Sequence, residues 1–176
     1  SLPIIAASIA APARSELTNV PQLRDVDAAL RILRHLGCTA EQLGNDVYID
    51  STGLTESTIP HSLMLEMRSS VIFMGALLAR CGVARLSLPG GCQLGKRPID
   101  IHLAALRKMG AQIEENGGEI SCSADKLRGT ELRLPFPSVG ATENIMLAAT
   151  AAEGVTVIHG AAREPEISAL ASYLRL

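Results

Sequence analysis

The stretch DVDAALRILRHLG, residues 25–37, returns in altered form at two later places in the chain. PIDIHLAALRKMG spans residues 98–110, and PEISALASYLRL spans residues 165–176. When the first residues are aligned, the apolar side chains fall in the same columns, three and four residues apart. That spacing is typical of a helix that buries one face. We therefore predict three equivalent helices.

Each of these helices belongs to a longer repeated unit. A segment of small and apolar residues precedes it, and a short β-rich stretch lies between the two, as in SSVIFMGALLAR followed by VARLSL. Segments in which apolar and polar residues alternate follow the first two copies. Asn116-Gly117-Gly118, between AQIEE and EISCS, indicates a hairpin turn. The unit is helix, strand, helix and hairpin, and the third copy stops inside its second helix.

The repeats predict one α/β domain with pseudo-threefold symmetry. A length of 176 residues is ordinary for a single domain. We place the three units at about residues 1–67, 68–138 and 139–176, the last incomplete. Apolar residues make up 47% of the chain but aromatic residues only 2%, so the core must be aliphatic.

Composition argues against several classes of protein. The net charge of -2 gives no electrostatic reason to expect a nucleic acid or an acidic membrane surface as partner. No apolar run approaches the length of a membrane span. The four cysteines contain no C-x-x-C pair, so we expect no metal site, and free thiols fit a reducing cytoplasm. The chain lacks an initiator Met, and we interpret it as a fragment whose first segment is a core helix.

The middle repeat contains about five extra residues between its strand and its second helix, within PGGCQLGKRPID, residues 89–100. Gly90, Gly95 and Lys96 match the Walker pattern until its last position, which requires Ser or Thr. Arg97 stands there instead. Insertions in one repeat often lie on a binding face, so we predict a different, exposed anion-binding loop.

Cys92 lies at the tip of this loop, among glycines that allow a ligand to approach the backbone. Lys96 and Arg97 should favour its thiolate, and Arg97 lies near a predicted helix start, where free N–H groups attract anions. We predict a reactive Cys92 and expect the other cysteines to be packed, unreactive thiols. Those are Cys38, Cys81 and Cys122.

Two further segments precede helix starts that are equivalent in the repeat. Arg68 stands before one, and Ser138-Val139-Gly140 stands before the other. Together they could hold an anionic ligand, since helix dipoles favour anions at their amino ends. The alternatives are a surface charge for Arg68 and a simple helix cap by Ser138 or Thr142.

Four segments closely resemble the UDP-N-acetylglucosamine 1-carboxyvinyltransferase family. They are LPGGCQLGKRPIDIHL, MRSSVIFMGALLAR, FPSVGATENIMLAA and AAREPEISALASYL. The resemblance extends over essentially the whole chain and implies one lobe of a two-lobed, inside-out α/β barrel. Such enzymes transfer the enolpyruvyl group of phosphoenolpyruvate to the 3′-hydroxyl of UDP-N-acetylglucosamine and release phosphate, the first committed step of peptidoglycan synthesis. The resemblance implies no cofactor and no metal, with the two substrates and the second lobe as partners.

The resemblance also implies roles for individual residues. Cys92 resembles the loop cysteine that takes part in proton transfer to phosphoenolpyruvate and that fosfomycin alkylates. Arg97 resembles the arginine at the phosphate groups. The remaining substrate-binding positions contact the nucleotide sugar. They are Arg68, Pro98, Ile99, Asp100, Ile101, Ser138, Val139 and Gly140.

Several family features are absent. A Lys-Asn pair that contacts phosphoenolpyruvate would precede Ser1, and the proposed general base and another phosphate-binding Arg belong to the other lobe. Phe136 and Pro137 occupy positions where some members have a basic residue and Val. We therefore expect no activity from the isolated chain. The alternatives are an enzyme like 5-enolpyruvylshikimate-3-phosphate synthase and a non-catalytic repeat domain that binds a ligand or partner.

Overall fold

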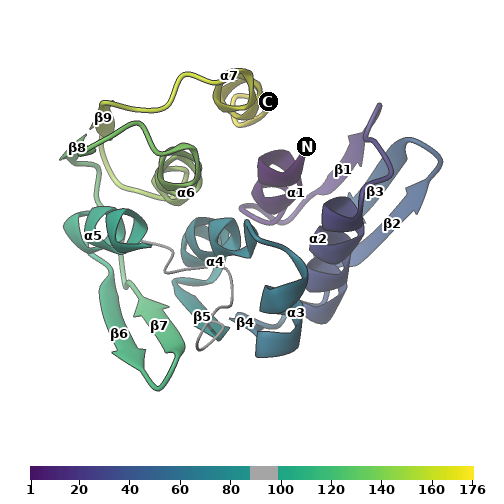
Figure 1. Ribbon diagram of the computed structural model, residues 1–176, viewed down its shortest axis with the longest axis horizontal. Coiled ribbons are helices and arrows are strands. Elements are labelled where there is room, and N and C mark those ends of the chain that lie inside the picture. Colours follow the sequence, from purple (N-terminus) through teal and green to yellow (C-terminus); the bar gives the residue numbers. More distant parts are fainter. Residues whose placement is uncertain (88–98) are drawn as a thin grey trace.

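Helices form the centre of the molecule and small sheets lie around them (Figure 1). The computed structural model describes residues 1–87 and 99–176. The three inner helices are rich in small and apolar residues because they are surrounded by other elements on most sides. They are α1 (Leu2–Ala7), α4 (Phe73–Cys81) and α6 (Val139–Ala149). The short 3-10 helix η1 (Ser70–Ile72) leads directly into α4.

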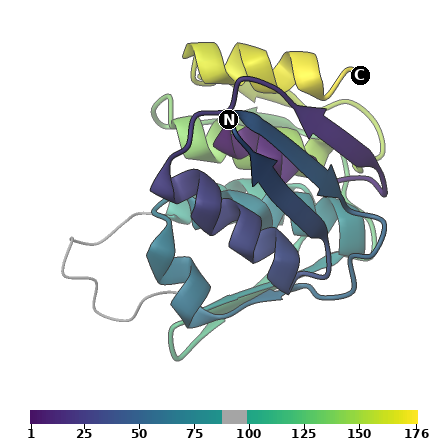
Figure 2. The same cartoon turned by 90° about the vertical axis from the view of Figure 1, so that its right-hand side faces the viewer.

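The outer helices are the three predicted from the repeated stretch. They are α2 (Arg24–His35), α5 (Asp100–Lys108) and α7 (Pro165–Tyr173). The shared apolar columns are the buried ones, since Leu30, Leu103 and Leu170 are all at most 2% exposed. In Figure 2, α7 lies beside β1 (Arg14–Leu17), and the Tyr173 hydroxyl is 2.9 Å from Ser15 Oγ. A further short helix, α3 (His61–Glu66), was not predicted.

The strands within residues 1–87 and 99–176 form three sheets. The first has the antiparallel order β1-β3-β2, and the second has the order β4-β5-β7-β6. The third pairs β8 with β9 in parallel. The strands are β2 (Thr39–Leu43), β3 (Asp46–Asp50), β4 (Thr58–Ile59), β5 (Val83–Ser87), β6 (Gln112–Asn116), β7 (Glu119–Ser123), β8 (Glu131–Arg133) and β9 (Val157–His159).

The hairpin turn predicted at Asn116-Gly117-Gly118 joins β6 to β7, and both glycines have positive φ. The first predicted strand, in contrast, ends earlier than expected. In the first repeat the β-rich stretch between the two helices is ELTNV, residues 16–20, but β1 stops at Leu17 and Asn19 adopts a φ of 58°. A left-handed residue cannot continue an extended strand, and this accounts for the difference.

The sheets support the proposed division of the chain. The orders β1-β3-β2 and β5-β7-β6 correspond, since in each a hairpin places its second strand against the strand between two helices. Both β4 and β8 also pair in parallel with the strand that follows the next inner helix. We propose on this basis that residues 1–67, 68–138 and 139–176 are copies of one unit.

The β8–β9 sheet has an open side. Among the described strands, β9 pairs only with β8. Val155 and Val157, before and at the start of β9, are 78% and 44% exposed. This edge is therefore an apolar part of the surface.

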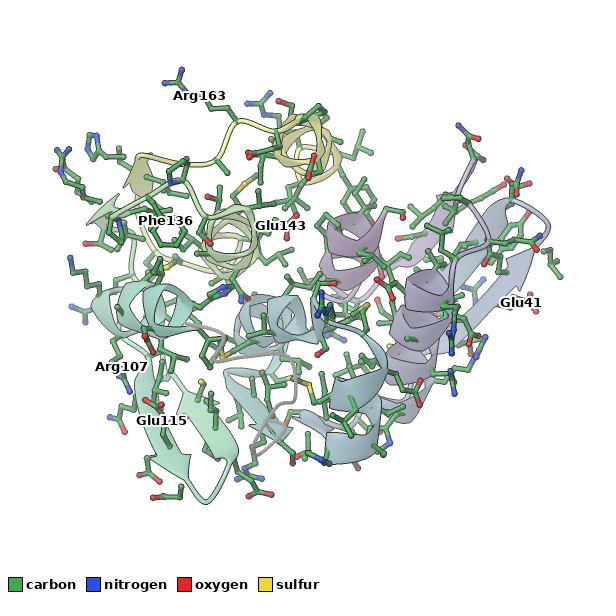
Figure 3. The ribbon with its side chains drawn as sticks, in the orientation of Figure 1. Glu41, Arg107, Glu115, Phe136, Glu143 and Arg163 are labelled. Carbon is green, nitrogen blue, oxygen red and sulfur yellow. The ribbon has the colours of Figure 1, made fainter. Side chains whose placement is uncertain are left out.

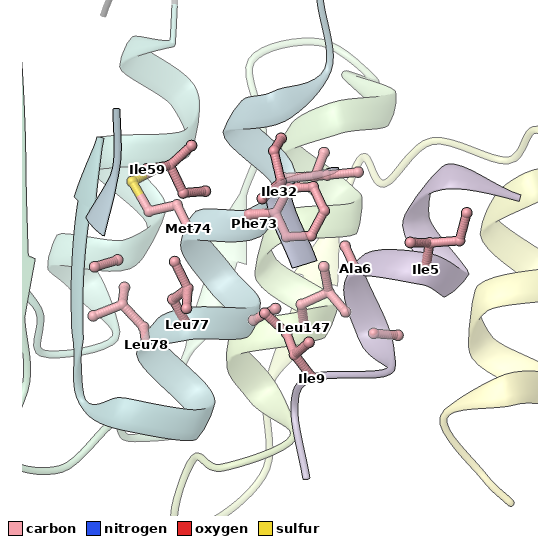
Figure 4. Packing of buried hydrophobic residues seen from close by; sticks show 14 of the residues in the cluster. Ile5, Ala6, Ile9, Ile32, Ile59, Phe73, Met74, Leu77, Leu78 and Leu147 are labelled. Atoms are coloured by element: carbon pink, nitrogen blue, oxygen red, sulfur yellow. The ribbon is translucent and has the colours of Figure 1, made fainter. Parts of the chain in front are cut away.

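The core is aliphatic, as the composition predicted. Phe73, the first residue of α4, is fully buried and its ring lies beside Ile32 of α2, whereas Met74 points toward Ile59 (Figure 4). Leu147 of α6 and Ile9, just after α1, extend the same cluster. Among residues 1–87 and 99–176, no helix has both the length and the apolar character needed to cross a membrane.

Candidate functional site

Apart from Arg68, the predicted site residues that the structure describes lie at the amino ends of α5 and α6, and these two helices pack against each other. Ile99 is the cap position of α5, Asp100 is its first residue and Ile101 follows, half-buried. Ser138 is the cap of α6, and Val139 and Gly140 form its first turn. Arg68 is exposed in the turn that precedes η1. The predicted site residues Cys92, Arg97 and Pro98 lie outside the described residues.

Ser138 acts as a helix cap. Its Oγ accepts a hydrogen bond of 3.3 Å from the Ala141 N–H, and its carbonyl oxygen accepts one of 2.8 Å from the Thr142 hydroxyl. The N–H groups of Val139 and Gly140, in the first turn, have no intrahelical acceptor. The cap alternative is therefore confirmed for Ser138.

Gly140 lies directly against the imidazole of His102 in α5. A Cβ at this position would lie 3.2 Å from His102 Cε1 and 3.6 Å from Nε2. A larger residue would push the ring away, so the absence of a side chain allows α6 to start close to α5.

His102 belongs to a buried hydrogen-bond network that connects four elements. Asn144 Nδ2 lies 2.8 Å from His102 Nδ1 and donates to the Val71 carbonyl at 2.9 Å. The Gly75 N–H donates to Asn144 Oδ1 at 2.7 Å. Asn144 is completely buried and His102 is 7% exposed. The network holds η1 and α4, α5 and α6 in a fixed relation around the helix starts.

The network defines the protonation of His102. Asn144 has one amide hydrogen for Val71 and one for His102, so Nδ1 must accept. Burial lowers the pKa of His102 to about 4, and the ring is therefore neutral at pH 7. A neutral ring that accepts at Nδ1 carries its proton on Nε2.

The helices α4 and α6 approach each other unusually closely at Gly75. A Cβ on Gly75 would lie 2.3 Å from the backbone oxygen of Asn144 and 2.8 Å from its Oδ1. Only glycine allows this approach, which also brings the Gly75 N–H within reach of the Asn144 side chain.

Glu143 is a buried acid on the side of α6 that faces α1 and α7 (Figure 3). It is 6% exposed. Desolvation raises the pKa of its carboxyl to about 7; Glu166 adds to the rise, and the amino-terminal ammonium opposes it. This carboxyl therefore titrates near neutral pH, away from the His102 network.

The described cysteines are poor nucleophiles. Cys38 and Cys122 are buried, as predicted, and burial raises their thiol pKa to about 11 and about 12. The prediction of a packed thiol was wrong for Cys81, which is exposed at the end of α4. Partial desolvation nevertheless raises the pKa of Cys81, which disfavours its thiolate.

Sequence reasoning missed His102, Asn144 and Glu143. Each is a polar residue in an otherwise apolar helical segment, and that contrast was the available signal. The segment ATENIMLAA carries Glu143 and Asn144 side by side, so they point to different neighbours around α6.

The chain was compared with known proteins. All of residues 1–176 match the family described as EPSP synthase (3-phosphoshikimate 1-carboxyvinyltransferase). The chain is 51% identical to UDP-N-acetylglucosamine 1-carboxyvinyltransferase 2 of Caldanaerobacter subterraneus subsp. tengcongensis, over 98% of this chain and 42% of that protein. It is 49% identical to UDP-N-acetylglucosamine 1-carboxyvinyltransferase of Halothermothrix orenii, over 99% of this chain and 42% of that protein. The chain thus spans well under half the length of these relatives.

Solved structures share the fold. The enolpyruvyl transferase NikO from Streptomyces tendae superposes with a TM-score of 0.84 at 21% identity, covering 99% of this chain and 41% of that one. EPSP synthase from Acinetobacter baumannii gives a TM-score of 0.71 at 24% identity, covering 95% of this chain and 40% of that one. The predicted enolpyruvyl transferase fold is confirmed. The relatives also carry the family name that the sequence motifs indicated.

Proposed function

Because the chain belongs to the EPSP synthase (3-phosphoshikimate 1-carboxyvinyltransferase) family, we propose that it is one lobe of a UDP-N-acetylglucosamine enolpyruvyl transferase. The complete enzyme transfers the enolpyruvyl group of phosphoenolpyruvate to the 3′-hydroxyl of the UDP-sugar and releases phosphate. The observation that carries this proposal is the 51% identity to a relative of that name over nearly the whole chain. The reaction would supply peptidoglycan synthesis in the cytoplasm.

The nucleotide sugar binds between the starts of α5 and α6. Residues 99–101 hold the nucleotide, and the Val139 and Gly140 N–H groups donate to phosphate oxygens. The dipole of α6 adds about 0.3–1 kcal/mol to the binding of an anion at its amino end. Arg68 and Arg97 supply the compensating positive charge, and no metal or cofactor takes part.

Cys92 supplies the proton chemistry. The reaction exchanges a C–O–phosphate bond for a C–O–sugar bond at one carbon of phosphoenolpyruvate. A proton added to the neighbouring methylene carbon makes the carbon that bears the phosphate electrophilic toward the 3′-hydroxyl, whose own proton passes to the general base expected in the other lobe. Loss of a proton from the new methyl group then restores the double bond as phosphate leaves. Phosphate bound beside Lys96 and Arg97 neutralises their charge and raises the pKa of the Cys92 thiol, which keeps the proton available.

Phosphate release by the complete gene product tests the proposal. The enzyme should release phosphate from phosphoenolpyruvate with UDP-N-acetylglucosamine as acceptor and not with 3-phosphoshikimate. A Cys92→Ala variant is the matched control for the loop chemistry. Turnover with 3-phosphoshikimate alone would assign the chain to the other substrate class, and ligand binding without phosphate release would favour a non-catalytic domain.

The isolated 176-residue chain should release no phosphate above the Cys92→Ala background. Catalysis by positioned groups from two lobes is cooperative, so the loss of one lobe removes nearly all of the rate enhancement. Turnover by the isolated chain well above that background would contradict the division of the site between lobes.

A further inference from the structure

The imidazole of His102 lies along one turn of α6. Its Nδ1 accepts from Asn144, and its Cε1 and Nε2 lie against Gly140, which is four residues earlier in the same helix. Residues four apart lie on one face of a helix, one turn from each other. The Nε2 end of the ring is therefore the end nearer the start of α6.

Nε2 carries a proton and has no hydrogen-bond acceptor among residues 1–87 and 99–176. Asn144 uses the other ring nitrogen, as its two amide hydrogens require. The only completely buried side-chain nitrogen or oxygen without a partner among the described residues is Thr156 Oγ1, so Nε2 keeps some contact with solvent. His102 is nevertheless 7% exposed as a whole. An oxygen of a bound ligand could therefore reach Nε2 from the solvent side and act as the acceptor that the described residues do not supply.

We propose that His102 is a ligand-binding residue whose Nε2–H donates to a phosphate oxygen of the nucleotide sugar held at the start of α6. This inference rests on the proposed function. The donor joins the free N–H groups of Val139 and Gly140, so three neutral donors meet at the amino end of an eleven-residue helix. Asn144 holds the ring in the tautomer that presents the donor.

Two substitutions separate the donor from the support of Asn144. In His102→Asn, the side-chain oxygen can occupy the place of Nδ1 and accept from Asn144, but no donor reaches the position of Nε2. In His102→Gln, the longer amide can place an N–H near the position of Nε2, but the acceptor for Asn144 is lost. The pair is therefore a matched test of which end of the ring the ligand uses.

Calorimetric titration of the 176-residue chain with UDP-N-acetylglucosamine should show about tenfold weaker binding for His102→Asn. His102→Gln should stay within about threefold of wild type. In wild type, the ¹⁵N resonance of His102 Nε2, assigned by its absence from the variants, should shift as the ligand is added. Inorganic pyrophosphate is the second probe, because it has the phosphates without the nucleoside or sugar.

The outcomes distinguish this inference from the proposed function. If pyrophosphate shifts Nε2 and binds less tightly to His102→Asn, but the UDP-sugar does not bind, the inference stands and the proposed acceptor substrate fails. If the UDP-sugar binds while Nε2 stays unmoved and His102→Asn binds normally, the inference is overturned and the proposed function is not. Binding of neither probe also overturns it. If His102→Asn fails to fold, the Nε2 shift in wild type decides alone.

Discussion

Gly75→Ala should destabilise the protein although it replaces glycine by a better helix former. The added methyl would lie 2.3 Å from the Asn144 backbone oxygen, so α4 and α6 must separate by about 1 Å to restore ordinary contact. Overpacking of this kind costs about 1–3 kcal/mol. Stretching the 2.7 Å bond from the Gly75 N–H adds about 0.5–1.5 kcal/mol. The helix preference of Ala returns only about 1 kcal/mol. A backbone contact this short places the overpacking cost at the high end, so we expect a net loss of about 2–3 kcal/mol.

Urea unfolding of the two proteins measures this loss, provided that the slope m is unchanged. In a chain of this size the same loss lowers Tm by about 4–12 °C. Gly117→Ala is the control, because a methyl group at Gly117 would meet no atom within 4 Å. Its cost comes only from the backbone φ of 59°. That change should cost about 1 kcal/mol through the left-handed backbone alone. If Gly75→Ala loses no more stability than Gly117→Ala, the close approach of α4 and α6 is not a constraint.

Three further predictions concern charge, capping and thiol chemistry. The pKa of Glu143 is raised in the folded state, so the contribution of this carboxyl to the free energy of unfolding is full below about pH 4.5 and is lost as pH rises through about 7. Glu143→Gln should therefore flatten the fall in the free energy of unfolding in urea between pH 5 and 8, and an unchanged slope would contradict this. Ser138→Ala should lower the free energy of unfolding by about 1 kcal/mol in the same assay. Ser138→Asp should keep the cap, but its negative charge should weaken binding of the UDP-sugar, so equal affinity of the two variants would argue against an anion at this helix start. Brief alkylation of the folded chain by a haloacetamide at neutral pH should label Cys92 first, as peptide mass mapping can check, and earlier labelling of Cys38, Cys81 or Cys122 would leave Cys92 an ordinary thiol.

The main elements of the fold could be predicted because the chain repeats itself. The apolar pattern of residues 25–37 occurs three times in the sequence, and the three copies form α2, α5 and α7. The hairpin at Gly117 followed from turn chemistry, which is local. The elements that were missed, α3 and β4, span only six and two residues, too few for a periodic apolar pattern. Their placement depends on contacts with distant parts of the chain.

The site was predictable only in its outline. The segments around Asp100 and Ser138 could be located because both precede helix starts. The hydrogen bonds among Gly75, His102 and Asn144 could not, because their partners are 42 and 69 residues apart and belong to different helices. A polar residue in an apolar segment shows that a partner is needed, but periodicity does not tell which residue supplies it.

The open side of β9 has a practical consequence for work with the isolated chain. An edge strand presents backbone N–H and C=O groups that can pair with another molecule. Here the edge also carries the exposed side chains of Val155 and Val157, without a charge between them. Purified chain should therefore self-associate as its concentration rises, in a manner unrelated to any ligand. Val157→Lys would place a charge on that edge and keep dilute and concentrated samples equally monodisperse.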